Sequence, residues 1–578
     1  MTQSAWITLL ALFASVSLLA FALQGYFARA LAGEKTFAAY ILLPLERLIY
    51  AIIGVKPDAQ QSWRAYAGSL LLFNAAGILL LFALLITQGI LPLNPQRLPG
   101  IEPGLAFNIA VAFVTNTDWQ AYAGETTLSY LSQMLGPTTQ GFLSAATGLA
   151  VMTALARGLA MKEAATLGHF YVDLTRATLY VLLPFALIFA IALIALGVPE
   201  NLSPSISATT LEGATQTIAQ GPVASLTSIK ILGSNGGGFF NANGAHPYEN
   251  PSPLSAFIQI VLILALPFAL VLAFGRMIGD RKQGLALACG MAILFLSLLT
   301  LSLASELQGS PILATLGIDQ NASDLNPGGS MEGKETRLGL VLSTIETIAA
   351  TATSNGTAMA SIESLTPLSG MAALFGLLTG GIAPGGIGCG VYGIFLYVLL
   401  SVFIAGLMVG RAPEYLGKKI EAYEIKLAVI AQLLYPLCVL GLGALALTLT
   451  TGIKSLSEQG PHGLTQMLYA YASAAANNGS AFAGLNANTA FLNLTLAATM
   501  LIGRYGIIIV VLAIAGSLAA KRKAIPSPGT LPTHSPTFVA MLICVILMFG
   551  GLSWFPALAL GPIGEHLSFS NASALPTQ

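Results

Sequence analysis

Charged residues are scarce in this chain of 578 residues, since Asp, Glu, Lys and Arg together make up only 8%, against about a quarter of an average soluble protein. Apolar residues make up 55%, and the mean hydropathy is +0.78. These values exclude an ordinary soluble domain and indicate a protein that crosses a membrane many times. The 24 basic and 24 acidic residues cancel, which argues against a nucleic-acid partner.

Cysteine and histidine are also rare. The four cysteines stand singly in apolar segments without CxxC spacing, so we expect small buried apolar residues at Cys289, Cys389, Cys438 and Cys544. The five histidines are far apart and lack metal-site spacing. The chain has no recognisable phosphorylation aspartate, and its one stretch with Walker A spacing, Gly328 to Lys334, is followed by Glu335 instead of Ser or Thr. We therefore expect a non-catalytic protein without a cofactor.

What the sequence does contain is a series of long apolar runs, each able to cross roughly 30 Å of hydrocarbon. The sequence predicts ten spanning helices, over residues 5–27, 66–86, 127–155, 174–196, 254–274, 285–303, 387–409, 427–449, 490–518 and 538–554. Most of the 24 Lys and Arg residues fall in loops 29–64, 157–176, 276–282, 411–426 and 521–523. Because basic loops stay in the cytoplasm, this pattern predicts that the N-terminus lies outside.

Between the runs, a short polar turn occurs four times. The turns are Thr115-Asn116-Thr117, Ser234-Asn235-Gly236, Ser354-Asn355-Gly356 and Asn477-Asn478-Gly479. Their asparagines at 116, 235, 355 and 478 are about 120 positions apart, a period that suits a transporter built from repeated membrane units. On the predicted topology, all four turns lie on the outer side.

Each turn follows a short, weakly amphipathic stretch, which predicts a short helix at residues 105–114, 215–232, 340–353 and 464–476. Glycine permits a bare and tightly approached backbone, and converging carbonyl oxygens can replace the hydration shell of a cation. For any one copy, an ordinary exposed turn would be the better explanation. Four evenly spaced copies between apolar runs favour an ion filter.

The predicted fold is therefore an all-α polytopic membrane protein with four membrane-pore-membrane repeats around a central filter and one extra helix at each end. The boundaries that we assign are 1–30 for the first extra helix, 65–160, 172–278, 284–412 and 425–520 for the repeats, and 535–560 for the last helix.

Three other features have two interpretations each. Arg504 lies inside the ninth run, where it either repels cations below the filter or is a structurally paired or snorkelling arginine. Residues 357–386 form a Gly/Pro-rich insertion, either a broken helix or gating loop, or a simple linker. The basic stretch 411–426 is either a surface helix that contacts a partner or a solvated face near lipid.

Longer motifs around these features resemble one family. They are Thr115 to Tyr130, Gly233 to Pro251 with the core Gly-Ser-Asn-Gly-Gly-Gly-Phe-Phe-Asn-Ala-Asn, Gly406 to Lys419, and Asn477 to Gly484. The four-repeat plan is similar to the potassium transporter superfamily that includes the Trk and Ktr proteins. The motifs resemble the potassium-binding A subunit of the bacterial Kdp potassium-transporting ATPase, from the first helix to the last.

This resemblance implies a potassium filter at Thr115, Asn116, Thr117, Ser234, Asn235, Gly236, Ser354, Asn355, Gly356, Asn478 and Gly479, with Gln120 and Arg504 lining the filter and its vestibule. It implies membrane lipids, a KdpB-like P-type ATPase subunit, a single-span KdpC-like subunit and a small KdpF-like peptide as partners, in the bacterial inner membrane. Potassium would enter from outside and pass sideways to the ATPase subunit.

Two positions depart from the family pattern. Asp118 stands where asparagine is usual and adds negative charge near the mouth, and Asn355 stands where cysteine is common. Neither change removes a backbone carbonyl, so we expect potassium selectivity to persist. A self-sufficient Trk/Ktr-like potassium channel or symporter remains the alternative, and a carrier for a small organic solute is a weaker one because the four turns are nearly equivalent.

Overall fold

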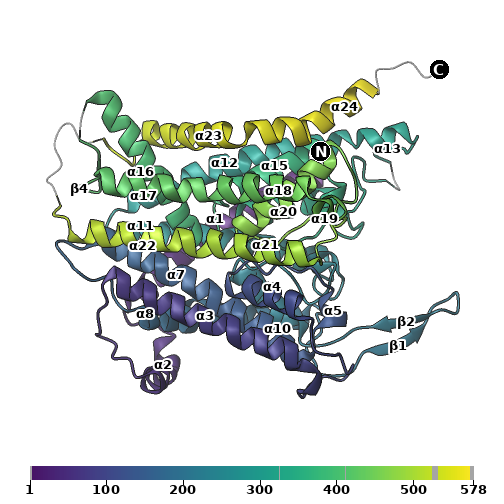
Figure 1. Ribbon diagram of the computed structural model, residues 1–578, viewed down its shortest axis with the longest axis horizontal. Coiled ribbons are helices and arrows are strands. Elements are labelled where there is room, and N and C mark those ends of the chain that lie inside the picture. The colour runs from purple at the N-terminus through teal and green to yellow at the C-terminus, as the bar shows by residue number, and fades with distance from the viewer. Residues whose placement is uncertain (1–2, 324–325, 411, 524–530, 573–578) are drawn as a thin grey trace.

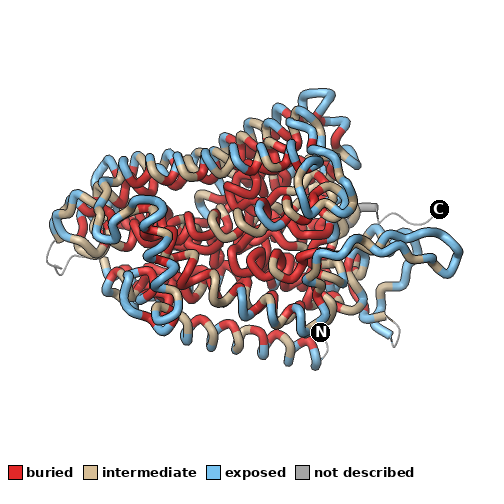
Figure 2. The backbone as a smooth tube through the Cα atoms, turned by 90° about the horizontal axis from the view of Figure 1, so that it is seen from below, coloured by how far each residue is buried: buried red, intermediate tan, exposed pale blue. Residues whose placement is uncertain are grey.

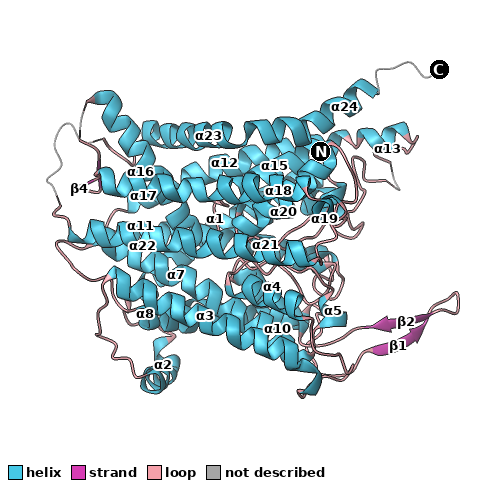
Figure 3. Ribbon diagram, viewed as in Figure 1, coloured by secondary structure: helices cyan, strands magenta, loops and turns pink. Residues whose placement is uncertain are grey.

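The computed structural model describes residues 3–323, 326–410, 412–523 and 531–572. Its helices run side by side in one bundle (Figures 1 and 3). Within the described residues, ten helical segments are long and apolar enough to cross a membrane, which confirms the predicted runs. In order they comprise α1 (Gln3–Ala32); α3 (Trp63–Thr87) with η1 (Gln88–Ile90); α6 (Tyr130–Gln133), η2 (Met134–Thr138) and α7 (Thr139–Ala160); α8 (Phe170–Arg176), η3 (Ala177–Leu182) and α9 (Leu183–Ala195); α11 (Pro253–Met277); α12 (Arg281–Gln308); α16 (Cys389–Val409); α17 (Ala422–Pro436), η6 (Leu437–Leu442) and α18 (Gly443–Thr448); α21 (Ala490–Leu501), η7 (Ile502–Gly506) and α22 (Ile507–Ala520); and α23 (Pro536–Leu558), η8 (Ala559–Ile563) and α24 (Gly564–Ala572).

Four shorter helices precede the four polar turns and are called pore helices below: α4 (Pro103–Val114), α10 (Val223–Leu232), α14 (Gly339–Ala352) and α20 (Pro461–Ala475). Two of them, α4 and α20, begin with proline, which fits the first helical turn because its missing N–H has no partner there. The helix predicted from Thr215 was wrong at its start. Residues Thr215–Ile218 form strand β2, and α10 begins only at Val223.

The remaining elements lie at the ends or the edge of the bundle or in loops, except the helix Pro367–Leu378, which packs inside the bundle against α12 and α14. They are α2 (Ala39–Ile53), α5 (Gly124–Thr127), η4 (Asn243–Ala245), α13 (Pro311–Thr315), η5 (Ile362–Ser364), α15 (Pro367–Leu378), α19 (Thr450–Ile453), β1 (Ile206–Thr209), β3 (Glu414–Tyr415) and β4 (Lys418–Lys419). Strands β1 and β2 pair antiparallel, with Ile206 opposite Ile218. This hairpin projects far from the helices, and both chain ends lie at the same end of the bundle (Figure 1).

The buried core is unusually polar in its centre. Buried residues fill the middle of the bundle, while the outer helices expose one side (Figure 2). The pore helices are almost entirely buried, and buried Ser, Thr and Asn residues follow them at each turn. Two of the cysteines were predicted wrongly, because Cys289 and Cys544 are exposed on the outside of the bundle. Surfaces of spanning helices that face lipid need not be polar, so apolar sequence does not distinguish them from the core.

The described part of the basic stretch, residues 412–426, does not form a surface helix, and Arg411 lies outside the described residues. Strands β3 and β4 make a short antiparallel hairpin there, and α17 begins only at Ala422. The Lys418 side chain is buried, and its Nζ donates to the carbonyl oxygens of Gly158 (3.1 Å), Met161 (2.6 Å) and Leu518. These carbonyls belong to the last turns of α7 and α22 or to the residue just after α7, and helix ends need such donors.

Candidate functional site

The four polar turns share one backbone conformation. The residue after each pore-helix C-cap has a left-handed φ, namely 66° at Asn116, 51° at Ser234, 53° at Ser354 and 52° at Asn477. The next N–H donates back to the pore helix in every repeat: Thr117 to Ala112 (2.9 Å), Asn235 to Lys230 (2.9 Å), Asn355 to Ala350 (3.0 Å) and Asn478 to Ser473 (2.9 Å). The turns are therefore structural equivalents.

This equivalence corrects the alignment of the first turn by one residue. Asn116 corresponds to Ser234, and Thr117, not Asn116, corresponds to Asn235 by both φ and hydrogen bond. Asp118, with a φ of 54°, then takes the place that glycine has in the other three turns. The letters of the motif had suggested a different match, because asparagine is used at both positions.

The turns meet at one point in the centre of the bundle. A Cβ atom placed on Gly236 would lie 2.5 Å from the carbonyl oxygen of Thr117 and would also overlap that of Asn478. One placed on Gly356 would overlap the Asn478 carbonyl, and one on Gly479 would overlap the Thr117 carbonyl. Backbone atoms from all four repeats thus pack so closely that no side chain fits between them. This is the approach for which glycine is needed.

The asparagine side chains join neighbouring turns. Asn116 Nδ2 donates to the Ser234 carbonyl at 2.7 Å, and Asn355 Nδ2 donates to that of Lys230 at 3.2 Å. Asn478 Nδ2 donates to the Ala350 carbonyl at 2.9 Å, and Asn477 Nδ2 donates to Thr117 Oγ1 at 2.9 Å. Each pair of neighbouring repeats in the ring is therefore joined by an asparagine hydrogen bond. The asparagine amides therefore fix the ring.

Gln120 joins the first and second repeats by two further hydrogen bonds. Its Nε2 donates to the Gly238 carbonyl at 2.9 Å, and its Oε1 accepts from the Gly238 N–H at 3.0 Å. Gln120 also lines a cavity of about 530 Å³, together with Gly237, Gly356 and Gly479. This cavity, called the outer cavity below, adjoins the glycines of the ring. An ion in it would reach the converging backbone directly.

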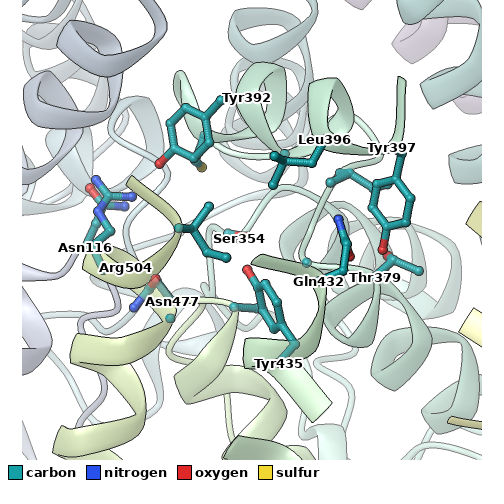
Figure 4. Close-up of a pocket in the computed structure, with 17 residues that line it drawn as sticks. Asn116, Ser354, Thr379, Tyr392, Leu396, Tyr397, Gln432, Tyr435, Asn477 and Arg504 are labelled. Carbon is teal, nitrogen blue, oxygen red and sulfur yellow. The ribbon is translucent and has the colours of Figure 1, made fainter. Parts of the chain in front are cut away.

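A second cavity lies on the other side of the turns, and we call it the inner cavity (Figure 4). Asn116, Ser354 and Asn477 line it beside Arg504, and its far wall carries Tyr435. Arg504 comes from the π-helical turn η7 and is only 4% exposed. Its Nη2 donates to the Ser144 carbonyl at 2.7 Å. A fixed cation thus stands at the wall of a small chamber.

The insertion of the third repeat reaches the same place. It contains η5 and α15, and its glycine-rich turn then runs from Thr379 to Gly388. A Cβ on Gly386 would lie 2.9 Å from the Thr353 carbonyl, and Gly381 packs against Ser354 Oγ. The turn therefore passes directly against the second and third polar turns on the inner-cavity side. Its placement favours the broken-helix interpretation over a simple linker, and its movement stays a prediction.

The sequence had suggested that Asp118 lies near an open mouth, but the structure buries this residue. The side chain is 3% exposed, and its Oδ1 has no hydrogen-bond partner among the described residues. Sequence reasoning also missed Lys230, which lies inside the short helix predicted at residues 215–232. Lys230 is buried on pore helix α10 and pairs with Glu249 at 2.5 Å. A charge inside a short apolar helix was the available signal, since such residues are rare and have buried partners.

Comparison with known proteins finds relatives that match nearly the whole chain. The chain is 53% identical over 545 residues to the potassium-transporting ATPase potassium-binding subunit of Rhodospirillum centenum, covering 94% of both chains. It is 51% identical over 568 residues to a protein of that name from Methylorubrum extorquens, covering 98% of both. The potassium transporter TrkH from Vibrio parahaemolyticus is similar in structure, with a TM-score of 0.49 and 15% identity over 89% of this chain and 98% of that one. The family model KdpA, potassium-transporting ATPase A subunit, matches residues 10–567. The resemblance seen in the motifs is thereby confirmed, and the chain belongs to the KdpA family of potassium-transporting ATPase A subunits.

Proposed function

We propose that this chain is the potassium-binding and translocating subunit of an ATP-driven, high-affinity potassium uptake pump. The observation that carries the proposal is the convergence of the four turns, in which a Cβ on Gly236 would overlap carbonyl oxygens of both the first and the fourth turn. Backbone carbonyls gathered around one axis suit a cation that has shed its water. Potassium is the substrate here, and the proposal includes no cofactor.

The path of the ion follows from the two cavities. Potassium enters from the outer cavity beside Gln120 and binds between the backbone carbonyls of the turns. It then reaches the inner cavity, where the guanidinium of Arg504 repels it. Because arginine keeps its charge at any physiological pH, a straight exit past Arg504 is unfavourable. The ion therefore leaves sideways, toward a partner subunit.

That partner is a KdpB-like P-type ATPase subunit, which hydrolyses ATP, while this chain is non-catalytic. A KdpC-like single-span subunit and a small KdpF-like peptide complete the complex, in the bacterial cytoplasmic (inner) membrane with the N-terminus of this chain outside. The segregation of the basic loops supports this orientation. The end of the bundle that carries α2 and β4 is opposite the end with the β1–β2 hairpin (Figure 1).

The test is potassium flux into liposomes. One set contains this chain alone, and a second contains it with the subunits that co-purify with it, with and without ATP on the side of α2. We expect flux only in the complex and only with ATP. Substantial passive flux through the chain alone would refute the proposal and identify a self-sufficient channel.

A further inference from the structure

A buried ion pair lies directly behind the second polar turn. Lys230 on α10 and Glu249 are 2% and 0% exposed at their side chains, and Lys230 Nζ is 2.5 Å from Glu249 Oε2. Glu249 Oε1 accepts from the Phe240 N–H at 2.9 Å. Removing charges from water is costly unless each has partners. Both buried charges therefore have partners, and the pair lies beside the second polar turn.

Asn243 connects this pair to the turn. Lys230 Nζ donates to Asn243 Oδ1 at 2.7 Å, and Asn243 Nδ2 donates to the carbonyl oxygen of Gly237. The same Oδ1 accepts from Thr357 Oγ1, at 2.9 Å, in the third repeat. One amide group thus forms hydrogen bonds with Gly237, which follows Gly236, and with Thr357, which follows Gly356. A charged donor on Oδ1 also strengthens the hydrogen bond that the same amide gives through Nδ2.

We propose that Lys230 is a positioning residue for the ion filter, acting through Asn243 to fix the Gly237 peptide and the spacing between the second and third turns. The inference rests on the proposed function, since it assigns Lys230 a part in choosing the ion. Gly237 has a φ of 64°, and its carbonyl is committed to Asn243. Without that bond, the peptide is free to rotate, and the ring loses the spacing that suits potassium better than the smaller sodium ion.

Glu249 has a separate electrostatic part. It neutralises an ammonium that would otherwise stand next to the filter and repel cations. Removal of Glu249 therefore lowers potassium affinity through charge. Removal of Lys230 leaves an anion and acts mainly on selectivity. A purely structural pair would lower protein stability in both variants and leave the choice of ion unchanged.

The sharpest test is Asn243→Asp. The carboxylate keeps an acceptor for Lys230 and Thr357 but has no N–H for the Gly237 carbonyl. The matched control is Asn241→Asp, which adds the same charge at an exposed position of the same loop, on the wall of the outer cavity. A charge there attracts sodium and potassium alike and leaves the Gly237 hydrogen bond intact. The readout is the ratio of sodium to potassium concentrations that half-saturate ATP hydrolysis by the purified complex. We expect Asn243→Asp to lower this ratio at least tenfold and Asn241→Asp to leave it unchanged.

Two further variants test Lys230 itself. Lys230→Met should lower the ratio in the same direction as Asn243→Asp, and Lys230→Arg, which retains a charged donor, should restore part of it. Glu249→Gln should raise the potassium concentration needed for half-saturation. A wild-type ratio in a folded, potassium-dependent Asn243→Asp complex would overturn the proposed role of Lys230 alone. Failure of the unaltered complex to respond to potassium would instead overturn the proposed function.

Discussion

Gly356→Ala tests the convergence of the turns. Gly356 has a φ of 67°, and a left-handed conformation costs a residue with a Cβ about 1–2 kcal/mol. In addition, the new Cβ would overlap the carbonyl carbon and oxygen of Asn478, so the fourth turn has to move. The substitution therefore has two effects, backbone strain and displacement of a carbonyl that we assign to the ion.

The chain offers a control that separates these effects. Gly339, at the start of the same pore helix, has a φ of 74°, and a Cβ there would meet nothing within 4 Å. Gly339→Ala thus carries the strain without the clash. Both variants should lower the melting temperature of the complex, and Gly356→Ala should lower it more because it adds the clash to the strain. Only Gly356→Ala should weaken potassium binding.

The expected loss of potassium affinity follows from the loss of one carbonyl contact with the ion. A loss of about 1.4 kcal/mol in binding free energy corresponds to a tenfold weaker affinity, and displacing one carbonyl from a dehydrated ion costs at least that much. The assay is the potassium dependence of ATP hydrolysis by the complex, with isothermal titration as a second measurement. Equal half-saturating potassium concentrations in the two alanine variants would refute the assignment of these turns to the filter.

Three other predictions concern the ends of the bundle. His462 donates to the carboxylates of Glu363 (3.2 Å) and Glu565 (3.0 Å), and these hydrogen bonds raise its pKa to about 10. The stabilisation is complete below the unfolded pKa of about 6.5 and is lost as the pH rises through 10, so the melting temperature should fall between pH 7 and 10.5, and fall less in His462→Gln. Lys418→Met should lower the unfolding free energy by about 2–4 kcal/mol, because buried carbonyls lose their donor. Lys419→Met, at a side chain 62% exposed, should change the melting temperature little. Equal effects of the two variants would contradict the role of Lys418 as the donor to these carbonyls. Ile41 on α2 is 80% exposed, and α2 lies beside α8 at the edge of the bundle (Figure 1). A fluorophore at Ile41→Cys should therefore be quenched by brominated lipids, and an unquenched probe would place α2 in water.

Much of this architecture could be predicted from local patterns. Length and hydropathy define a spanning helix, because a run of apolar residues has no alternative to crossing the membrane as a helix. All ten runs were found in this way. The four turns were found because glycine, asparagine, serine and threonine interrupt apolar sequence at regular intervals. The motifs around them were specific enough to indicate the family, which the family model confirms.

Other features depend on contacts between residues far apart in the chain, and only the tertiary structure decided them. The first turn could not be aligned by its letters, since Asn116 and Asn235 look alike but differ in φ and in hydrogen-bond partners. Lys418 was predicted in a loop and Lys230 in a short helix, yet both are buried against partners that the sequence places elsewhere. The physical reason is that burial of a charge depends on which acceptors the fold brings to it, and hydropathy averaged along the chain carries no information about them.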